Sequence, residues 1–191
     1  MAASVNPRSI LLRLLSCTTL LDVAPESVAQ PVLAPPPAYG VAARHAGVPS
    51  DVLFAVALQE SGVALRGRRV PWPWTLNISG TALYFEKQAD ACRALQQALK
   101  HHPATRIDAG LTQINLGHQR RFYRHPCELL HPHRNLAIAA LILREQYRNG
   151  EDWLAAAGRY HRPAGGPLAA RYRRSVSKHL NQLAWTGSYR P

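Results

Sequence analysis

A single carboxylate stands at the end of an apolar segment of this chain. In FAVALQESGVAL, residues 54–65, Glu60 follows apolar residues and is followed by Ser61 and Gly62. A carboxylate at the C-terminal end of a helix opposes the helix dipole, and apolar surroundings raise its pKa. A carboxyl group that stays protonated near neutral pH can serve as a general acid. The segment therefore raises the hypothesis of a catalytic acid, although these residues alone favour an ordinary exposed glutamate.

The stretch HPCELLHPH gathers residue types that bind metals. It places His125, Cys127, His131 and His133 close together, and imidazole and thiolate are common zinc ligands. Their spacing matches no zinc pattern, and the two prolines restrict the backbone. We expect no metal site here and no cofactor elsewhere in the chain.

The first residues have features of an export signal. Arg8 precedes the apolar run SILLRLLSCTTLL, and the small residues Ser27 and Ala29 stand as they do before a cleavage site. This pattern predicts a secretory signal peptide over residues 1–29 and a periplasmic protein. Arg13 interrupts the apolar run, so an amphipathic N-terminal segment remains the alternative. No other stretch approaches the ~18–20 apolar residues that span a bilayer, so any membrane contact would be peripheral.

Cleavage after Ala29 would leave Cys92 and Cys127 as the cysteines of the mature chain. Disulfides form and persist in exported proteins, so these residues are candidates for a disulfide between two structural elements. The sequence does not show that they meet, and two unpaired thiols remain the alternative.

Prolines, turn residues and helical spacing indicate the elements that position the predicted acid. The Pro-rich stretch over residues 30–39 predicts a linker that is not helical. Ser50 is a good N-cap for a helix over residues 50–60. The runs WTLNI and TALYF flank Ser79-Gly80, which predicts a hairpin.

The rest of the chain reads mostly as helix. The fold class predicted is mainly α, a helical domain with one small β-hairpin. The expected elements are a helix over residues 86–101, a loop entering a short helix over 107–119, helices over 135–148 and 151–160, and a last helix over 168–184.

Three short motifs carry a family resemblance. ALQESG, GLTQIN and GRYH, in this order, resemble the Glu-Ser, Gly-Leu-Met-Gln and Ala-Tyr-Asn signatures of the soluble lytic transglycosylase (SLT) family. The resemblance covers residues 40–184 and implies a lysozyme-like helical domain, with residues 185–191 as a C-terminal tail. PWPWTLNISG, LLHPHRNLAIAALILREQY and GRYHRP are similar to the subgroup encoded with integrating conjugative elements and type IV secretion systems.

The resemblance implies an enzyme that acts on the glycan strands of peptidoglycan. Glu60 would protonate the glycosidic oxygen between N-acetylmuramic acid and N-acetylglucosamine and then act as base, and Ser61 would orient Glu60 or the substrate. One carboxylate suffices, because the sugar's own 6-hydroxyl attacks the anomeric carbon and gives a 1,6-anhydro product. Hydrolysing glycosidases typically use two carboxylates. The nearest candidate for a second one is Asp108, for which a loop-capping role is the simpler interpretation.

The other two signatures imply residues of the substrate cleft. Gly110 and Leu111 would shape a loop, and Gln113 would line the cleft near the sugar. Tyr160 would form a hydrogen bond near Glu60 and help to set its protonation.

Two positions depart from the family pattern. Thr112 replaces the usual Met at a position that lines the cleft, so we expect a subsite of different shape. His161 replaces the usual Asn and would bring a polar contact or a second titrating group to the site.

The formal net charge of +12 implies an acidic partner. The anionic cell wall fits this charge. We therefore expect a monomer that opens the wall locally for a conjugation or type IV secretion apparatus and that binds no nucleic acid. Three alternatives stay open: a hydrolysing muramidase on the same fold, an inactive peptidoglycan-binding protein, and a nucleic-acid-binding accessory protein of a mobile element. The last one leaves Glu60, Gln113 and Tyr160 unexplained.

Overall fold

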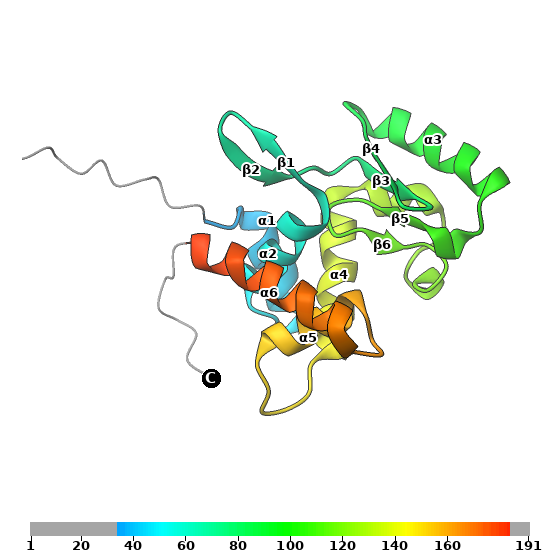
Figure 1. Ribbon diagram of the computed structural model, residues 1–191. Helices are drawn as coiled ribbons and strands as arrows, with labels where there is room; N and C mark the ends of the chain where they lie inside the picture. The colour runs from blue at the N-terminus through cyan, green and yellow to red at the C-terminus, as the bar shows by residue number, and fades with distance from the viewer. Residues whose placement is uncertain (1–33, 184–191) are drawn as a thin grey trace, which may run out of the picture. The chain divides into compact units, whose positions relative to one another are not determined.

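The computed structural model describes residues 34–183 of the chain. The predicted signal peptide over residues 1–29 and the predicted tail over 185–191 lie outside the described residues. The described part is mainly helical with a small β region, which confirms the predicted fold class (Figure 1). Within it, no helix taken singly has the length and hydropathy of a membrane span; the pair α1 (Pro37–Ala46) and α2 (Ser50–Ser61) passes by length and composition but is bent by 116°.

Four helices pack around a fifth, α2. Residues 52–58 of α2 are all buried, because this helix contacts each of the four others. The surrounding helices are α1, α4 (Pro132–Gln146), α5 (Trp153–His161) and α6 (Gly166–Gln182). A helix that is apolar on every side needs such a complete covering.

The strands form a second region beside these helices (Figure 1). A four-stranded antiparallel sheet has the order β4-β3-β5-β6, and α3 (Gln88–His101) packs against it. Its strands are β3 (Thr75–Ile78), β4 (Thr81–Tyr84), β5 (Ile107–Ala109) and β6 (Ile114–Asn115), and the short helices η1 (Ala104–Arg106), η2 (Arg120–Phe122) and η3 (Pro126–Leu130) complete this region. A separate hairpin, β1 (Gly62–Leu65) and β2 (Arg68–Pro71), follows α2 directly.

Helix α4 belongs to both regions. Its residues Leu136 and Leu143 lie in the core of the helical region, whereas Ile138 and Ile142 lie in the core beneath the sheet. Tyr160 packs against both cores. The two regions therefore meet along α4 and α5.

Several predicted boundaries are wrong for physical reasons. The predicted linker over 30–39 overlaps α1, which begins at Pro37, because proline is well tolerated in the first turn of a helix. The same tolerance starts α4 at Pro132. Ser50 lies inside α2 and makes no capping hydrogen bond.

Two β features differ from the prediction. Residues 107–119 form β5 and β6 around a tight loop and enter no α-helix. The hairpin β1–β2 was not predicted at all; it turns at Arg66 and Gly67, which both have positive φ, as the tight turns of two-residue hairpins require. The predicted hairpin around Ser79-Gly80 is confirmed as β3–β4.

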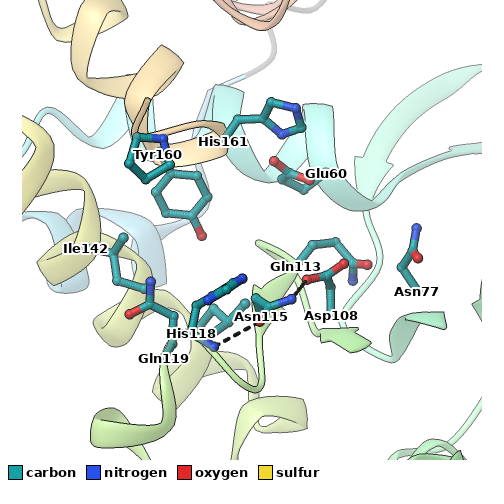
Figure 2. Close-up of a pocket in the computed structure, with 12 residues that line it drawn as sticks. Glu60, Asn77, Asp108, Gln113, Asn115, His118, Gln119, Ile142, Tyr160 and His161 are labelled. Atoms are coloured by element: carbon teal, nitrogen blue, oxygen red, sulfur yellow. Dashed lines mark hydrogen bonds between the residues drawn. The ribbon is translucent and has the colours of Figure 1, made fainter. Parts of the chain in front are cut away.

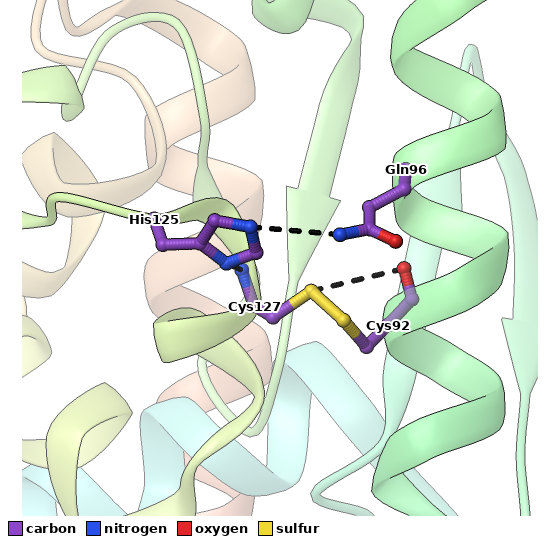
Figure 3. Close-up of a disulfide and its surroundings, with 4 residues drawn as sticks. All are labelled: Cys92, Gln96, His125 and Cys127. Atoms are coloured by element: carbon purple, nitrogen blue, oxygen red, sulfur yellow. Dashed lines mark hydrogen bonds between the residues drawn. A yellow bond between two sulfur atoms is a disulfide. The ribbon is translucent and has the colours of Figure 1, made fainter.

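A disulfide joins Cys92 on α3 to Cys127 in η3 (Figure 3), with the two Cα atoms 5.3 Å apart. It fixes α3 to the segment that leads into α4. Since 35 residues separate the two cysteines, the bond removes much conformational freedom from the unfolded chain.

Candidate active site

Glu60 lies in the last turn of α2, where the chain leaves the helix for β1. Gly62 follows at the helix end, and a Cβ there would lie 2.3 Å from the carbonyl oxygen of Leu58 and 2.4 Å from Nε of Arg69. The same Arg69 Nε donates a hydrogen bond to the Leu58 carbonyl. Glycine is thus required for close approach of β2 to the helix end. Its φ of −65° is open to any residue.

The carboxyl group of Glu60 is held by a tyrosine from the last helix. The hydroxyl of Tyr172 in α6 donates a hydrogen bond of 2.6 Å to Oε1 of Glu60. Burial raises the pKa of Glu60 to about 7; the bond from Tyr172 acts against this, and the nearby charge of Asp108 adds to it. Near neutral pH the group is therefore divided between its acid and its base forms, as acid–base catalysis requires.

Glu60 lines a cleft of about 380 Å³ between the helical region and the sheet region (Figure 2). One side comes from α2 and α5, and the other from the sheet and the loop after β6. The lining is rich in polar groups that can bind sugar hydroxyls. It consists of Glu60, Asn77, Asp108, Gln113, Ile114, Asn115, His118, Gln119, Ile142, Tyr160, His161 and Pro163.

The loop between β5 and β6 is held from behind by Asn135. This buried side chain donates hydrogen bonds to the carbonyls of Ala109 (3.0 Å) and Leu129 (2.8 Å). Its Oδ1 accepts from both the amide (3.0 Å) and the hydroxyl (2.7 Å) of Thr112. Gly110 has φ +83°, and a Cβ there would lie 2.2 Å from Nδ2 of Asn135. The expectation that Thr112 lines the cleft is wrong, because its side chain is buried against Asn135.

Ser61 fastens this loop to the helix that carries the acid. Its hydroxyl is buried and donates a 2.6 Å hydrogen bond to the carbonyl of Leu111. Ser61, Gly110 and Leu111 are all buried and absent from the cleft lining. These three residues position the loop and the helix end that carries Glu60.

Gln113, Tyr160 and His161 do line the cleft. Gln113 has φ +48°, and its Nε2 donates to the carbonyls of Gly110 and Thr75, which fixes its side chain. The hydroxyl of Tyr160 donates to the carbonyl of Thr112 at 2.9 Å. Tyr160 therefore joins α5 to the loop, and the tyrosine that bonds directly to Glu60 is Tyr172.

Asp108 also differs from its simpler interpretation. It lies in β5, paired with Asn77 of β3 and Asn115 of β6, and it lines the cleft, so it is no loop cap. It accepts a 2.8 Å hydrogen bond from Nδ2 of Asn115. Burial raises the pKa of Asp108, while the bond from Asn115 and the charges of His118 and His161 lower it.

In HPCELLHPH, Cys127 and His125 have structural roles. Cys127 is bonded to Cys92 and offers no thiolate. His125 caps η3, because its Nδ1 accepts from the amide of Cys127. Within residues 34–183, no group of three or more potential metal-binding side chains comes together.

The family model of the transglycosylase SLT domain matches residues 38–182. The chain belongs to the transglycosylase SLT family. Members of this family are lytic transglycosylases, and the SLT domain supports lytic transglycosylase activity on peptidoglycan. A search of curated proteins and a search of solved structures each found no match.

In this SLT domain the three sequence signatures converge on one cleft. Glu60 comes from the first, Gln113 from the second, and Tyr160 and His161 from the third. Sequence reasoning missed Tyr172. The sequence indicates only that this tyrosine shares the buried face of α6 with Val176, four residues later, and not that its hydroxyl meets Glu60. It also missed Asn77 and Asn115. Asn77 lies in the run WTLNI, which was predicted as a strand, but nothing local shows that this strand borders the cleft; Asn115 lies in β6, which was not predicted.

Proposed function

We propose that the chain is a peptidoglycan lytic transglycosylase that cleaves the β-1,4 bond between N-acetylmuramic acid and N-acetylglucosamine. The observation that carries this proposal is Glu60, a carboxyl group at the cleft with a pKa raised to about 7 and a hydrogen bond from Tyr172. The family supports the same activity. An acid of this pKa can give up a proton and take it back at neutral pH.

Two proton transfers complete the reaction. Protonated Glu60 donates to the glycosidic oxygen as the bond from that oxygen to C1 of N-acetylmuramic acid breaks. The 6-hydroxyl of the same sugar then attacks C1, and its proton passes to the carboxylate of Glu60. The products are a free 4-hydroxyl on N-acetylglucosamine and a 1,6-anhydro ring, and the acid is regenerated. The hydrogen bond from Tyr172 stabilises the carboxylate that exists between the two transfers.

The test is digestion of purified peptidoglycan by the full-length chain, with products analysed by mass spectrometry. We expect anhydro-muropeptides from the wild type and none from Glu60→Gln, which keeps size and loses the titrating group. Gln96→Ala on the exposed side of α3 is the matched control, because its side chain lies outside the cleft. Anhydro products from Glu60→Gln at the wild-type rate would contradict the proposal.

A second candidate function is a hydrolysing muramidase, and Asp108 is the observation that favours it. Asp108 lines the same cleft as Glu60, and its charge raises the pKa of Glu60. Hydrolysing glycosidases typically use two carboxyl groups, one as general acid and the other as base or nucleophile. Products with reducing ends, lost in Asp108→Asn, would establish hydrolysis. Anhydro products that persist in Asp108→Asn would leave Glu60 as the one essential carboxylate.

We further propose that the protein is exported to the periplasm and opens the wall for a conjugation or type IV secretion apparatus. The signal-like N-terminus and the similarity to the subgroup encoded with conjugative elements support this role, and the disulfide suits an oxidising compartment. Cell fractionation tests the location: recovery with the cytoplasm would contradict export. Transfer frequency in a strain that lacks the gene, complemented by wild type or Glu60→Gln, tests the role. Equal transfer with both would contradict it.

A further inference from the structure

The imidazole of His161 lies flat against the ring of Tyr172. The two ring centroids are 4.5 Å apart and the ring planes differ by only 4°. His161 is the last residue of α5 and lines the cleft, whereas Tyr172 lies on the buried face of α6. The hydroxyl of that same tyrosine donates the 2.6 Å hydrogen bond to Glu60. Three side chains from three helices thus form a continuous series.

We propose that His161 is a positioning residue, which holds the ring of Tyr172 so that its hydroxyl stays hydrogen-bonded to Glu60. A tyrosine hydroxyl lies at the far end of a rigid ring, so a small tilt of the ring moves the oxygen out of hydrogen-bond range. His161 closes the face of that ring towards the cleft, where water and substrate would otherwise reach it. The inference rests on the proposed role of Glu60.

The surroundings of His161 act on its pKa in both directions. Burial lowers the pKa of His161, and the adjacent Arg162 lowers it further, while Asp108 of β5 acts in the opposite direction. The imidazole ring also stacks on the ring of Tyr172, whose hydroxyl bonds to Glu60. His161 acts on Tyr172 through the packing of the two stacked rings, and stacked aromatic pairs add stability beyond their buried area.

The proposal is tested by titrating Glu60 in the full-length protein without substrate. The chain has six glutamates, so ¹³C labelling of glutamate side chains gives few signals, and Glu60→Gln assigns the relevant one. The variants are His161→Leu, His161→Phe, Tyr172→Phe and the double variant His161→Leu/Tyr172→Phe. Each is checked for a cooperative thermal transition. If His161→Leu does not fold, His161→Asn takes its place in the single and the double variant.

The expected result is a coupling between the two positions. Tyr172→Phe removes a bond that lowers the pKa of Glu60, so that pKa rises. His161→Leu raises it by about 0.5 pH unit in the wild-type background and does not change it further in Tyr172→Phe. His161→Phe keeps a flat ring and retains the wild-type value. A double-mutant cycle separates this coupling from any change in hydration, which both backgrounds share.

Two results would overturn the proposal. His161→Leu could leave the pKa of Glu60 unchanged, or its effect could be equal in both backgrounds, which would mean that His161 acts on Glu60 without Tyr172. Because the titration needs neither substrate nor turnover, it is independent of the products of digestion. Failure of the proposed function would appear in the digest, and failure of this inference in the titration.

Discussion

Asn135→Ala should be the most destabilising single polar substitution behind the cleft. The side chain is fully buried and takes part in four hydrogen bonds, two to carbonyls and two from Thr112. A typical hydrogen bond contributes about 0.5–1.5 kcal/mol net, and a buried partner left unpaired costs more. Since a water molecule in the vacated space can restore part of this, we expect a loss of about 3–4 kcal/mol, a large share of the stability of an ordinary domain.

Urea unfolding of the full-length chain, followed by far-UV circular dichroism, measures this loss. Asn149→Ala is the matched control, because Asn149 is exposed after the end of α4 and its truncation should change the free energy of unfolding by less than about 0.5 kcal/mol. A loss below about 1 kcal/mol for Asn135→Ala, with an unchanged urea dependence, would refute the view that Asn135 organises the loop.

The other predictions concern the acid, the disulfide and the helix end. Since Glu60 must be protonated to act, cleavage should decline as the pH rises through about 7, which a pH–rate profile would measure; a profile flat to pH 9 would exclude this acid. Because the folded-state pKa of Glu60 lies above the value of 4.5 for a free carboxyl, stability should fall between these values as pH rises, by at most about 3 kcal/mol, and Glu60→Gln should remove this slope in unfolding measured at pH 5 and 8. Replacing Cys92 and Cys127 with serine should lower the free energy of unfolding by about 3–4 kcal/mol, and a melting temperature unaffected by either replacement or reductant would contradict it. Gly62→Ala should disturb the helix end through contact with the Leu58 carbonyl and reduce cleavage; normal turnover in a stably folded variant would contradict it.

The helices were predictable because their signals are local. The body of α2, residues 52–58, is apolar throughout and α3 shows regular apolar spacing, so both helices were found within two residues of their bounds. Errors arose where a residue's conformation depends on distant partners. Residues 107–119 form two short strands only because β3, some thirty residues earlier, pairs with β5. No local pattern in the sequence reports that pairing.

In the site, too, residues in local motifs were predictable, and contacts between distant parts of the chain were not. Glu60 and Gln113 were found from motifs, and the structure places both at the cleft. Ser61 was expected to orient Glu60 or the substrate, but the motif did not show which group its hydroxyl meets: the carbonyl of Leu111, fifty residues later in the chain. Tyr172 was missed because a tyrosine in an amphipathic helix is usually a packing residue. Only the folded chain shows that its hydroxyl meets a carboxyl group that lies 112 residues earlier.

Helix α4 has a mechanical consequence for the whole domain. Its opposite faces are embedded in two different cores, and its residue Ile142 also forms part of the cleft. One continuous helix therefore connects the two walls of the cleft. A change in the width of the cleft would require this helix to bend or one of its faces to slide within its core. The packing of α4 in both cores thus links the width of the cleft to the integrity of the whole domain.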